Sequence, residues 1–93
     1  MEIDSIRHKG LRNLVEKGQA KGVIEPARLV DMIAFLVAAE GLDELGVPPN
    51  FGFHPLTGNR QGAYAMTVTK NWRLTFVATD EGTLADLDLE DYH

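Results

Sequence analysis

The stretch that decides the fold is residues 63–78, which read AYAMTVTKNWRLTFVA. Large apolar side chains alternate with smaller or polar ones through both halves of this stretch, and such alternation predicts half-buried β-strands. The large apolar positions are Tyr64, Met66, Val68, Trp72, Leu74 and Phe76. Between the halves lies Lys70-Asn71, a two-residue connection in which Asn tolerates positive φ. The stretch therefore predicts an antiparallel β-hairpin.

The neighbouring segments extend this hairpin into a larger sheet. After a turn at residues 80–82, alternation places Ala85, Leu87 and Leu89 on one face of a further strand. Residues 52–56 predict another strand. Two more features are turn-forming residues at 57–62 and a short strand at 2–6.

The first half of the chain has helical periodicity. Apolar residues recur at helical spacing over residues 8–17, and Gly18 ends that segment. A second helix is predicted from Pro26, which suits a first helical position, to Gly41, a natural C-terminal stop, and a short helical turn follows at 42–46. Two helices that cover one face of an antiparallel sheet make an α+β fold of two layers, which is our prediction.

Length and composition limit the classes of protein. At 93 residues and 10.3 kDa the chain is short enough for a single domain, residues 1–93. Cysteine is absent, which excludes a disulfide framework, thiol catalysis and Cys-ligated zinc, and fits a reducing compartment. The longest apolar run, which contains Ile33–Ala39, is far shorter than the roughly 20 residues that cross a bilayer. The N-terminus lacks the features of a signal peptide, so we expect a cytoplasmic protein with no membrane partner.

The net charge of −5 hides a gradient along the chain. Residues 1–28 carry +2, residues 29–79 carry −1, and residues 80–93 carry −6 without any Lys or Arg. An acidic balance disfavours polyanionic partners. Residues 51–79, however, contain Arg60, Lys70 and Arg73 and no acid, which predicts a local cationic surface. The alternative is that these charges cluster by chance.

Generic catalytic motifs are missing from the sequence. There is no phosphate-binding glycine loop, no metal-binding histidine pair and no nucleophile elbow, so we expect neither a metal nor a cofactor. The remaining candidates are His8, His54 and the terminal run Glu90–His93. The alternatives are a structural role for His54 and a frayed chain terminus for His93. If the last strand pairs with residues 72–78, the chain end lies near Lys70-Asn71. Periodicity leaves open whether His54 and Arg60 reach the same place.

Four separated blocks resemble the HigB toxins of the RelE/ParE superfamily, which belong to type II toxin–antitoxin modules. The blocks are Ile6–Leu11, His54–Gly62, Asn71–Phe76 and Glu90–His93, and the likeness covers essentially the whole chain. It implies a RelE-like, microbial-RNase-like fold and a metal-independent endoribonuclease that cuts mRNA in the ribosomal A site. It also implies a helix-turn-helix, HigA-like antitoxin, which inhibits the toxin and represses the operon that encodes both proteins. The toxin would then be linked to DNA only indirectly, through the antitoxin.

The resemblance also assigns roles to individual residues. His54, Asp91, Tyr92 and His93 match the family's catalytic set, Arg60 and Arg73 match basic positions near the scissile phosphate, and Lys70 is a further candidate cation. In the implied reaction the RNA 2′-hydroxyl attacks, a base removes its proton and an acid protonates the leaving 5′-oxygen. His54 is one of these groups and His93 or Asp91 is the other; which histidine is the acid stays open. Arg73 clamps the phosphate, and Tyr92 stacks on a base or orients the substrate.

Two departures from the family pattern point to weaker activity. The family commonly has Lys at the position of Thr57 and charged residues at those of Asn59 and Gln61, and its members are usually basic, unlike this chain. A catalytically weakened toxin that serves as the antitoxin's partner and co-repressor is therefore one alternative. A non-catalytic, ParE-like poison of DNA gyrase is another, although the intact terminal Asp91-Tyr92-His93 weighs against it.

Overall fold

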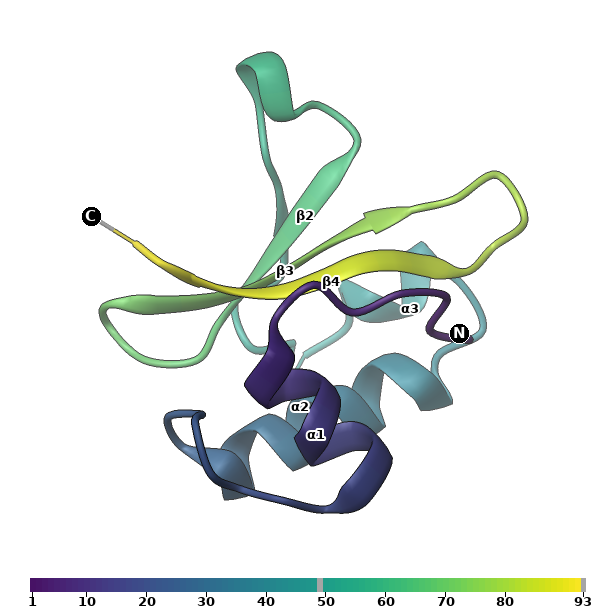
Figure 1. The fold of residues 1–93 in the computed structure, drawn as a ribbon. Coiled ribbons are helices and arrows are strands. Elements are labelled where there is room, and N and C mark those ends of the chain that lie inside the picture. Colours follow the sequence, from purple (N-terminus) through teal and green to yellow (C-terminus); the bar gives the residue numbers. More distant parts are fainter. Residues whose placement is uncertain (49, 93) are drawn as a thin grey trace.

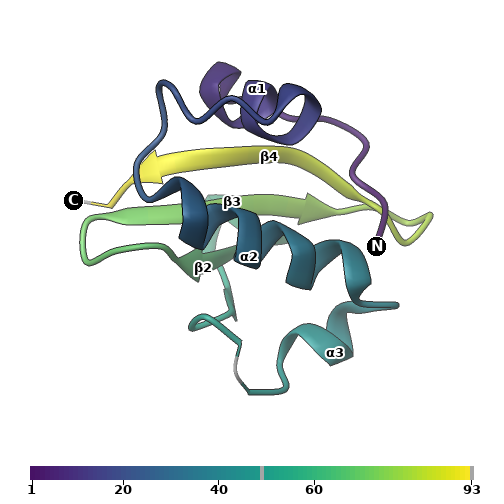
Figure 2. The same cartoon turned by 90° about the horizontal axis from the view of Figure 1, so that it is seen from below.

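The computed structural model describes residues 1–48 and 50–92, and it has two layers. The sheet has the order β1-β2-β3-β4, with each neighbouring pair antiparallel. Its strands are β1 (His54–Pro55), β2 (Ala63–Thr67), β3 (Trp72–Ala78) and β4 (Leu84–Asp91). The helices α1 (Lys9–Lys17), α2 (Pro26–Ala38) and α3 (Leu42–Leu45) lie on one side of the sheet, as Figures 1 and 2 show. The predicted α+β fold is therefore confirmed.

The helices begin and end where local chemistry favours it. His8 caps α1, because its Nδ1 accepts a hydrogen bond from the Leu11 N–H at 3.1 Å. Gly18 ends α1 in the left-handed region at φ 69°. Pro26 is the first residue of α2, and the amino group of Met1 donates hydrogen bonds to carbonyls at the other end of that helix. None of the helices in the described part of the chain is long and apolar enough to cross a membrane.

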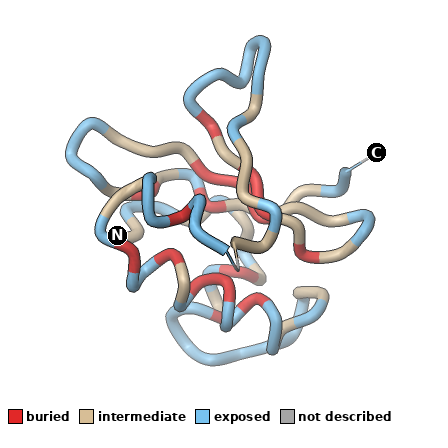
Figure 3. The backbone as a smooth tube through the Cα atoms, turned by 180° about the vertical axis from the view of Figure 1, so that it is seen from behind, coloured by how far each residue is buried: buried red, intermediate tan, exposed pale blue. Residues whose placement is uncertain are grey.

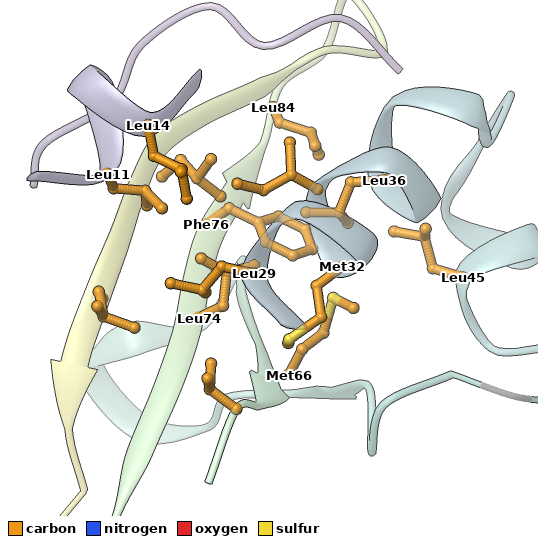
Figure 4. Close-up of a cluster of buried hydrophobic side chains, with 14 of the residues drawn as sticks. Leu11, Leu14, Leu29, Met32, Leu36, Leu45, Met66, Leu74, Phe76 and Leu84 are labelled. Atoms are coloured by element: carbon orange, nitrogen blue, oxygen red, sulfur yellow. The ribbon is translucent and has the colours of Figure 1, made fainter. Parts of the chain in front are cut away.

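The core lies between α2 and the inner face of the sheet. Phe76 is in the middle of the cluster, with side chains of α2 on one side and those of the strands around it (Figure 4). The fully buried large side chains are Phe76, Leu11, Leu29, Met32, Leu36, Leu45, Met66, Leu74, Leu84 and Leu87. Buried positions follow the helices and strands, and the connecting loops are mostly exposed (Figure 3). The large apolar residues that alternate along β2 and β3, such as Met66, Leu74 and Phe76, are therefore the ones that these strands contribute to the core.

The connection between β2 and β3 is longer than the predicted two residues, although the Trp72 N–H donates to the Thr69 carbonyl at 3.4 Å and so closes a turn around Lys70-Asn71. β2 ends at Thr67 and β3 begins at Trp72, so the connection has four residues, from Val68 to Asn71. The carbonyls of Thr67 and Val68 accept hydrogen bonds from the Arg28 guanidinium, at 3.1 and 2.7 Å respectively. These two carbonyls therefore bind a side chain at the end of the β2–β3 ladder.

The predicted strand at 52–56 is reduced to the two residues of β1. Pro55 has no N–H to donate to a ladder, which limits pairing at this edge of the sheet. The connection from β1 to β2, which contains the short 3₁₀ helix η1 (Gly58–Arg60), projects away from the helices (Figure 1).

The alternation predicted for the last strand is interrupted. A bulge shifts the β3–β4 register between Thr75 and Val77, and Asp86 has a positive φ of 55°. Leu84 is consequently buried in the core, in place of the predicted Ala85.

The predicted strand at 2–6 is present only as two isolated parallel bridges, Ile3 with Leu84 and Ile6 with Leu87. The N-terminal segment thus runs along the outer edge of β4 (Figure 1).

Gly10 offers a test of the packing between α1 and the loop before α2. A Cβ at this position would lie 2.8 Å from the Gly22 carbonyl oxygen, which is part of the backbone. We expect Gly10→Ala to lower the free energy of unfolding by about 1–3 kcal/mol, because overpacking outweighs the better helix propensity of Ala. Urea denaturation measures the difference. Gly46→Ala is the matched control, since its Cβ would meet nothing closer than 3.8 Å. A stabilised Gly10→Ala protein would contradict the expectation.

Candidate functional site

The candidate site lies on the face of the sheet that the helices leave open. Alternation along β3 directs Arg73 and Thr75 to this face, because Leu74 and Phe76 face the core. A hollow of about 220 Å³ opens there. It is lined by Leu56, Arg60, Ala65, Arg73, Thr75, Glu90, Asp91 and Tyr92. Residues from β2, β3, β4 and the β1–β2 connection thus meet at one place.

An ion pair crosses the middle of this face. Arg60 donates from Nη1 to Glu90 Oε1 at 2.8 Å and from Nη2 to Glu90 Oε2 at 2.7 Å, and the Thr75 hydroxyl donates to the same Oε2. The Arg60 and Glu90 side chains are 45% and 31% exposed, whereas Thr75 is only 4% exposed. The carboxylate therefore accepts three hydrogen bonds and holds Arg60 in a bidentate geometry.

These contacts shift the ionisation of both partners. The hydrogen bonds from Arg60 lower the pKa of Glu90 below its ordinary value; the Thr75 hydroxyl and the nearby charge of Arg7 lower it further, against the opposing effect of burial. The same pairing raises the pKa of Arg60, again opposed by burial. Both groups are thus charged at neutral pH.

Arg73 is fixed beside the pair by the β2–β3 turn. Its Nη1 donates to the carbonyls of Thr69, Lys70 and Trp72 at 2.8, 3.3 and 3.2 Å. Its guanidinium carbon lies 4.1 Å from the centre of the Tyr92 ring, a cation–π contact. Tyr92 remains 57% exposed, so the ring is held in place but is still accessible.

The chain end lies where the topology predicts. Asp91 pairs with Trp72, and the Tyr92 N–H donates to the Asn71 carbonyl at 2.6 Å, so the end of β4 meets the β2–β3 turn. Asp91 lines the hollow and is exposed. His93 lies outside the described residues. Lys70 is exposed on the turn and does not line the hollow.

His54 shares the open face but not the hollow itself. It pairs with Ala65, and residues directly opposite each other in an antiparallel ladder share a face. Its Nδ1 lies 2.8 Å from the Gly52 carbonyl oxygen, and because a carbonyl only accepts, Nδ1 carries the proton. In neutral His54 the other nitrogen, Nε2, is therefore the proton acceptor.

The expected cationic surface is partly neutralised, which corrects the prediction from the charge run. Glu90 and Asp91 arrive from β4 beside Arg60 and Arg73, so two carboxylates accompany two guanidinium groups. Sequence reasoning treated Glu90 only as part of the terminal acidic run and missed Thr75. The β3–β4 register places Glu90 opposite Arg73, and that pairing was the signal that could have identified it.

Among the described residues, metal ligands do not gather on this face. Within residues 1–48 and 50–92, no three His, Cys, Asp or Glu side chains lie close enough together to hold a metal ion.

Comparison with known proteins adds two findings at the level of sequence. A family model described as the RelE-like toxin of the type II toxin–antitoxin system HigB matches residues 4–93. Endoribonuclease HigB of Proteus vulgaris is 43% identical over 94 residues, which cover 98% of this chain and 99% of that protein.

Solved structures resemble the chain in fold. YafQ of E. coli superposes with a TM-score of 0.65 at 17% identity, covering 97% of this chain and 91% of YafQ. A chain of the toxin–antitoxin complex RelBE2 of Mycobacterium tuberculosis gives 0.51 at 18% identity, covering 99% and 96%. At these identities the likeness concerns the fold alone.

The Glu90 contacts predict a pH-dependent contribution to stability. A carboxylate whose pKa is lowered by folding stabilises the folded state above its unfolded pKa, here the ordinary 4.5, and loses that contribution as pH falls through the folded value. We expect Glu90→Gln to be less stable than the wild type at neutral pH, by at most about 1 kcal/mol for so exposed a pair. The difference should vanish in acid.

Thermal unfolding between pH 2 and 8 measures this difference. Glu81→Gln, which removes an exposed carboxylate from the β3–β4 turn, is the control. A stability difference between wild type and Glu90→Gln that stays constant across this range would contradict the assignment.

Proposed function

The chain belongs to the HigB-like family of RelE-like toxins of type II toxin–antitoxin systems, as its four sequence blocks predicted, and from this membership we propose that it is a toxin that cuts mRNA in the ribosomal A site. The observation that carries the proposal is the group of Arg60, Arg73, Asp91 and Tyr92 around one hollow on the open face of the sheet. The name endoribonuclease, given to the Proteus vulgaris relative, fits that group. Ribosomes are its site of action, so we place the toxin in the cytoplasm.

The first chemical step uses the nucleophile that RNA carries. The 2′-hydroxyl attacks the adjacent phosphorus once a base removes its proton. We assign the base to His54, because its Nδ1 is committed to the Gly52 carbonyl and its Nε2 accepts a proton. His54 lies opposite Ala65, which lines the hollow, and substrate binding brings His54 to the reacting groups, since catalytic contacts often tighten only in the complex.

The phosphate is held by the two arginines. Arg73 is already fixed by the β2–β3 turn, whereas Arg60 is bound to Glu90. The scissile phosphodiester offers Arg60 two oxygens in the same bidentate geometry, and its negative charge grows as the 2′-oxygen attacks, so Arg60 exchanges Glu90 for the substrate. Both guanidinium groups then stabilise the negative charge that develops on the phosphoryl oxygens.

The leaving 5′-oxygen is protonated from the chain end. Asp91 lines the hollow, and His93 follows Tyr92 in the sequence, so either residue supplies the acid. Tyr92 presents an accessible ring on which a base stacks, a contact worth about 1–3 kcal/mol per base.

A type II toxin has an antitoxin partner. We propose that this antitoxin is a HigA-like helix-turn-helix protein, which connects the toxin to DNA through the shared operon. The Glu90–Arg60 pair favours a second candidate function, that of a weakened toxin acting as the antitoxin's co-repressor, because Glu90 competes with the substrate for Arg60.

The proposed chemistry predicts that His54→Ala strongly slows mRNA cleavage, and that Asp91→Asn does the same where Asp91, rather than His93, is the acid. Loss of one general acid or base lowers the rate by about 10²–10⁴-fold. Mapping mRNA 3′ ends during translation with purified ribosomes measures the effect. His8→Asn is the control, because it removes a histidine outside the hollow and keeps a good helix cap. Cleavage that survives both site substitutions would contradict the proposal, and a wild type that never cuts would favour the co-repressor.

A second prediction concerns the cation missing at Thr57. This exposed residue follows Leu56, which lines the hollow, and its extended backbone accepts any side chain. We expect Thr57→Lys to raise kcat/KM severalfold, with a gain that fades as salt increases. Gln19→Lys adds the same charge just after α1, far along the chain from the site, and should change little. Equal gains in both variants would show that only net charge matters.

A further inference from the structure

The N-terminal block Ile6–Leu11 is not used by the proposed chemistry, and most of its residues have structural roles. Ile6 packs against the core and bridges to β4, and Leu11 is fully buried. His8 caps α1, and Gly10 leaves room for the Gly22 carbonyl. Arg7 is different, because its side chain is exposed and lies on the open face of the sheet.

The backbone determines where Arg7 lies. Its N–H donates to the Leu87 carbonyl at 2.8 Å, next to the parallel bridge between Ile6 and Leu87. This pairing brings the start of the chain alongside β4 and carries Arg7 over the edge of the sheet. Its positive charge is close enough to Glu90 to lower the pKa of that carboxyl.

Arg7 lines a second hollow of about 240 Å³. This hollow shares Arg60, Thr75 and Glu90 with the first one, so the two lie on either side of the ion pair. Its other polar lining residues are Asn59 and Gln61 from the β1–β2 connection and Asp86 from the bulge of β4.

The lining suits a nucleotide better than a simple anion. Arg7 offers a cation for a phosphate, whereas Asp86 repels a bare anion and accepts hydrogen bonds from amino or hydroxyl groups. The Asn59 and Gln61 side chains carry both donors and acceptors, as base edges do. At about 240 Å³ the hollow is smaller than the roughly 300–1,000 Å³ of a typical ligand pocket, which fits one nucleotide rather than a larger ligand.

We propose that this second hollow binds the nucleotide next to the scissile phosphodiester, with Arg7 on its phosphate and Asn59 and Gln61 at its base edge. The inference rests on the proposed function and assigns a substrate subsite to it. The subsite also makes it easier for Arg60 to leave Glu90. When Arg60 binds the scissile phosphate, the Glu90 carboxylate still accepts the hydrogen bond from the Thr75 hydroxyl and still lies near the positive charge of Arg7.

The test compares wild type, Arg7→Ala and Lys9→Ala for binding of labelled 2′-fluoro oligoribonucleotides of one to six residues. These probes lack the 2′-hydroxyl and are not cut by the proposed reaction. Lys9 is the control because it is an exposed cation two residues further along that does not line the hollow. We expect that one added nucleotide in the series raises the affinity about tenfold in the wild type and in Lys9→Ala. This increase should be absent in Arg7→Ala. The salt slope of log affinity should fall by about 0.7 in Arg7→Ala alone.

The subsite is overturned if Arg7→Ala and Lys9→Ala lose the same affinity for probes of every length. It is also overturned if the affinity of Arg7→Ala increases with probe length as that of the wild type does, or if the wild type binds no probe. Ribosomal cleavage separates this failure from that of the proposed function. If the wild type cuts mRNA and Arg7→Ala cuts it equally well, only the subsite is wrong, whereas a wild type that never cuts refutes the nuclease itself.

Discussion

β3 carries the constraint on which the rest of the molecule depends, because its side chains alternate between the core and the site. Leu74 and Phe76 face the helices, whereas Arg73 and Thr75 face the open side. The strand lies between β2 and β4, so its register also sets which residues of those strands meet it. A slip of one residue would expose Phe76 and bury Arg73 without a partner, at a large cost in free energy. Stability of the core and geometry of the site are thus fixed by the same pairing.

The register of β3 with β4 also explains why a carboxylate stands among the cations. Glu90 lies opposite Arg73 and binds Arg60 in the geometry that a phosphate would take. An ion pair this exposed stabilises the fold by only about 0–1 kcal/mol. Its larger effect is on order, since it holds the long and flexible Arg60 side chain in one bidentate conformation. In the proposed reaction Glu90 therefore has two opposing effects, since it orients Arg60 and must also release it before a phosphate binds.

The sequence predicted those features that depend on local periodicity and capping. The hairpin strands, the helix that starts at Pro26 and the stop at Gly18 all follow from residues close to one another in the chain. The errors occur where the local structure depends on residues distant in the chain or on a strand irregularity. Arg28 binds the carbonyls of Thr67 and Val68 in the connection that is longer than predicted. The bulge near Asp86 buries Leu84 in the core in place of Ala85.

The same distinction applies to the site. Its candidate residues were predicted from the family resemblance, because spacing in the sequence does not show which side chains meet across a sheet. Glu90 lies 30 residues from Arg60 and 15 from Thr75, and only the strand register brings the three together.

The N-terminal segment ties the two faces of the sheet to each other. Arg7 reaches the open face, while Gly10, three residues later, packs against Gly22 on the helix side. The bridge from Ile6 to Leu87 fixes the position of Arg7, and the helix cap at His8 fixes the position of Gly10. The backbone between Arg7 and Gly10 therefore has little freedom to move. A displacement of α1 would therefore pull on the Arg7 backbone and disturb the hollow beside the Arg60–Glu90 pair. In a chain this small, the packing of a helix and the shape of the opposite surface are not independent properties.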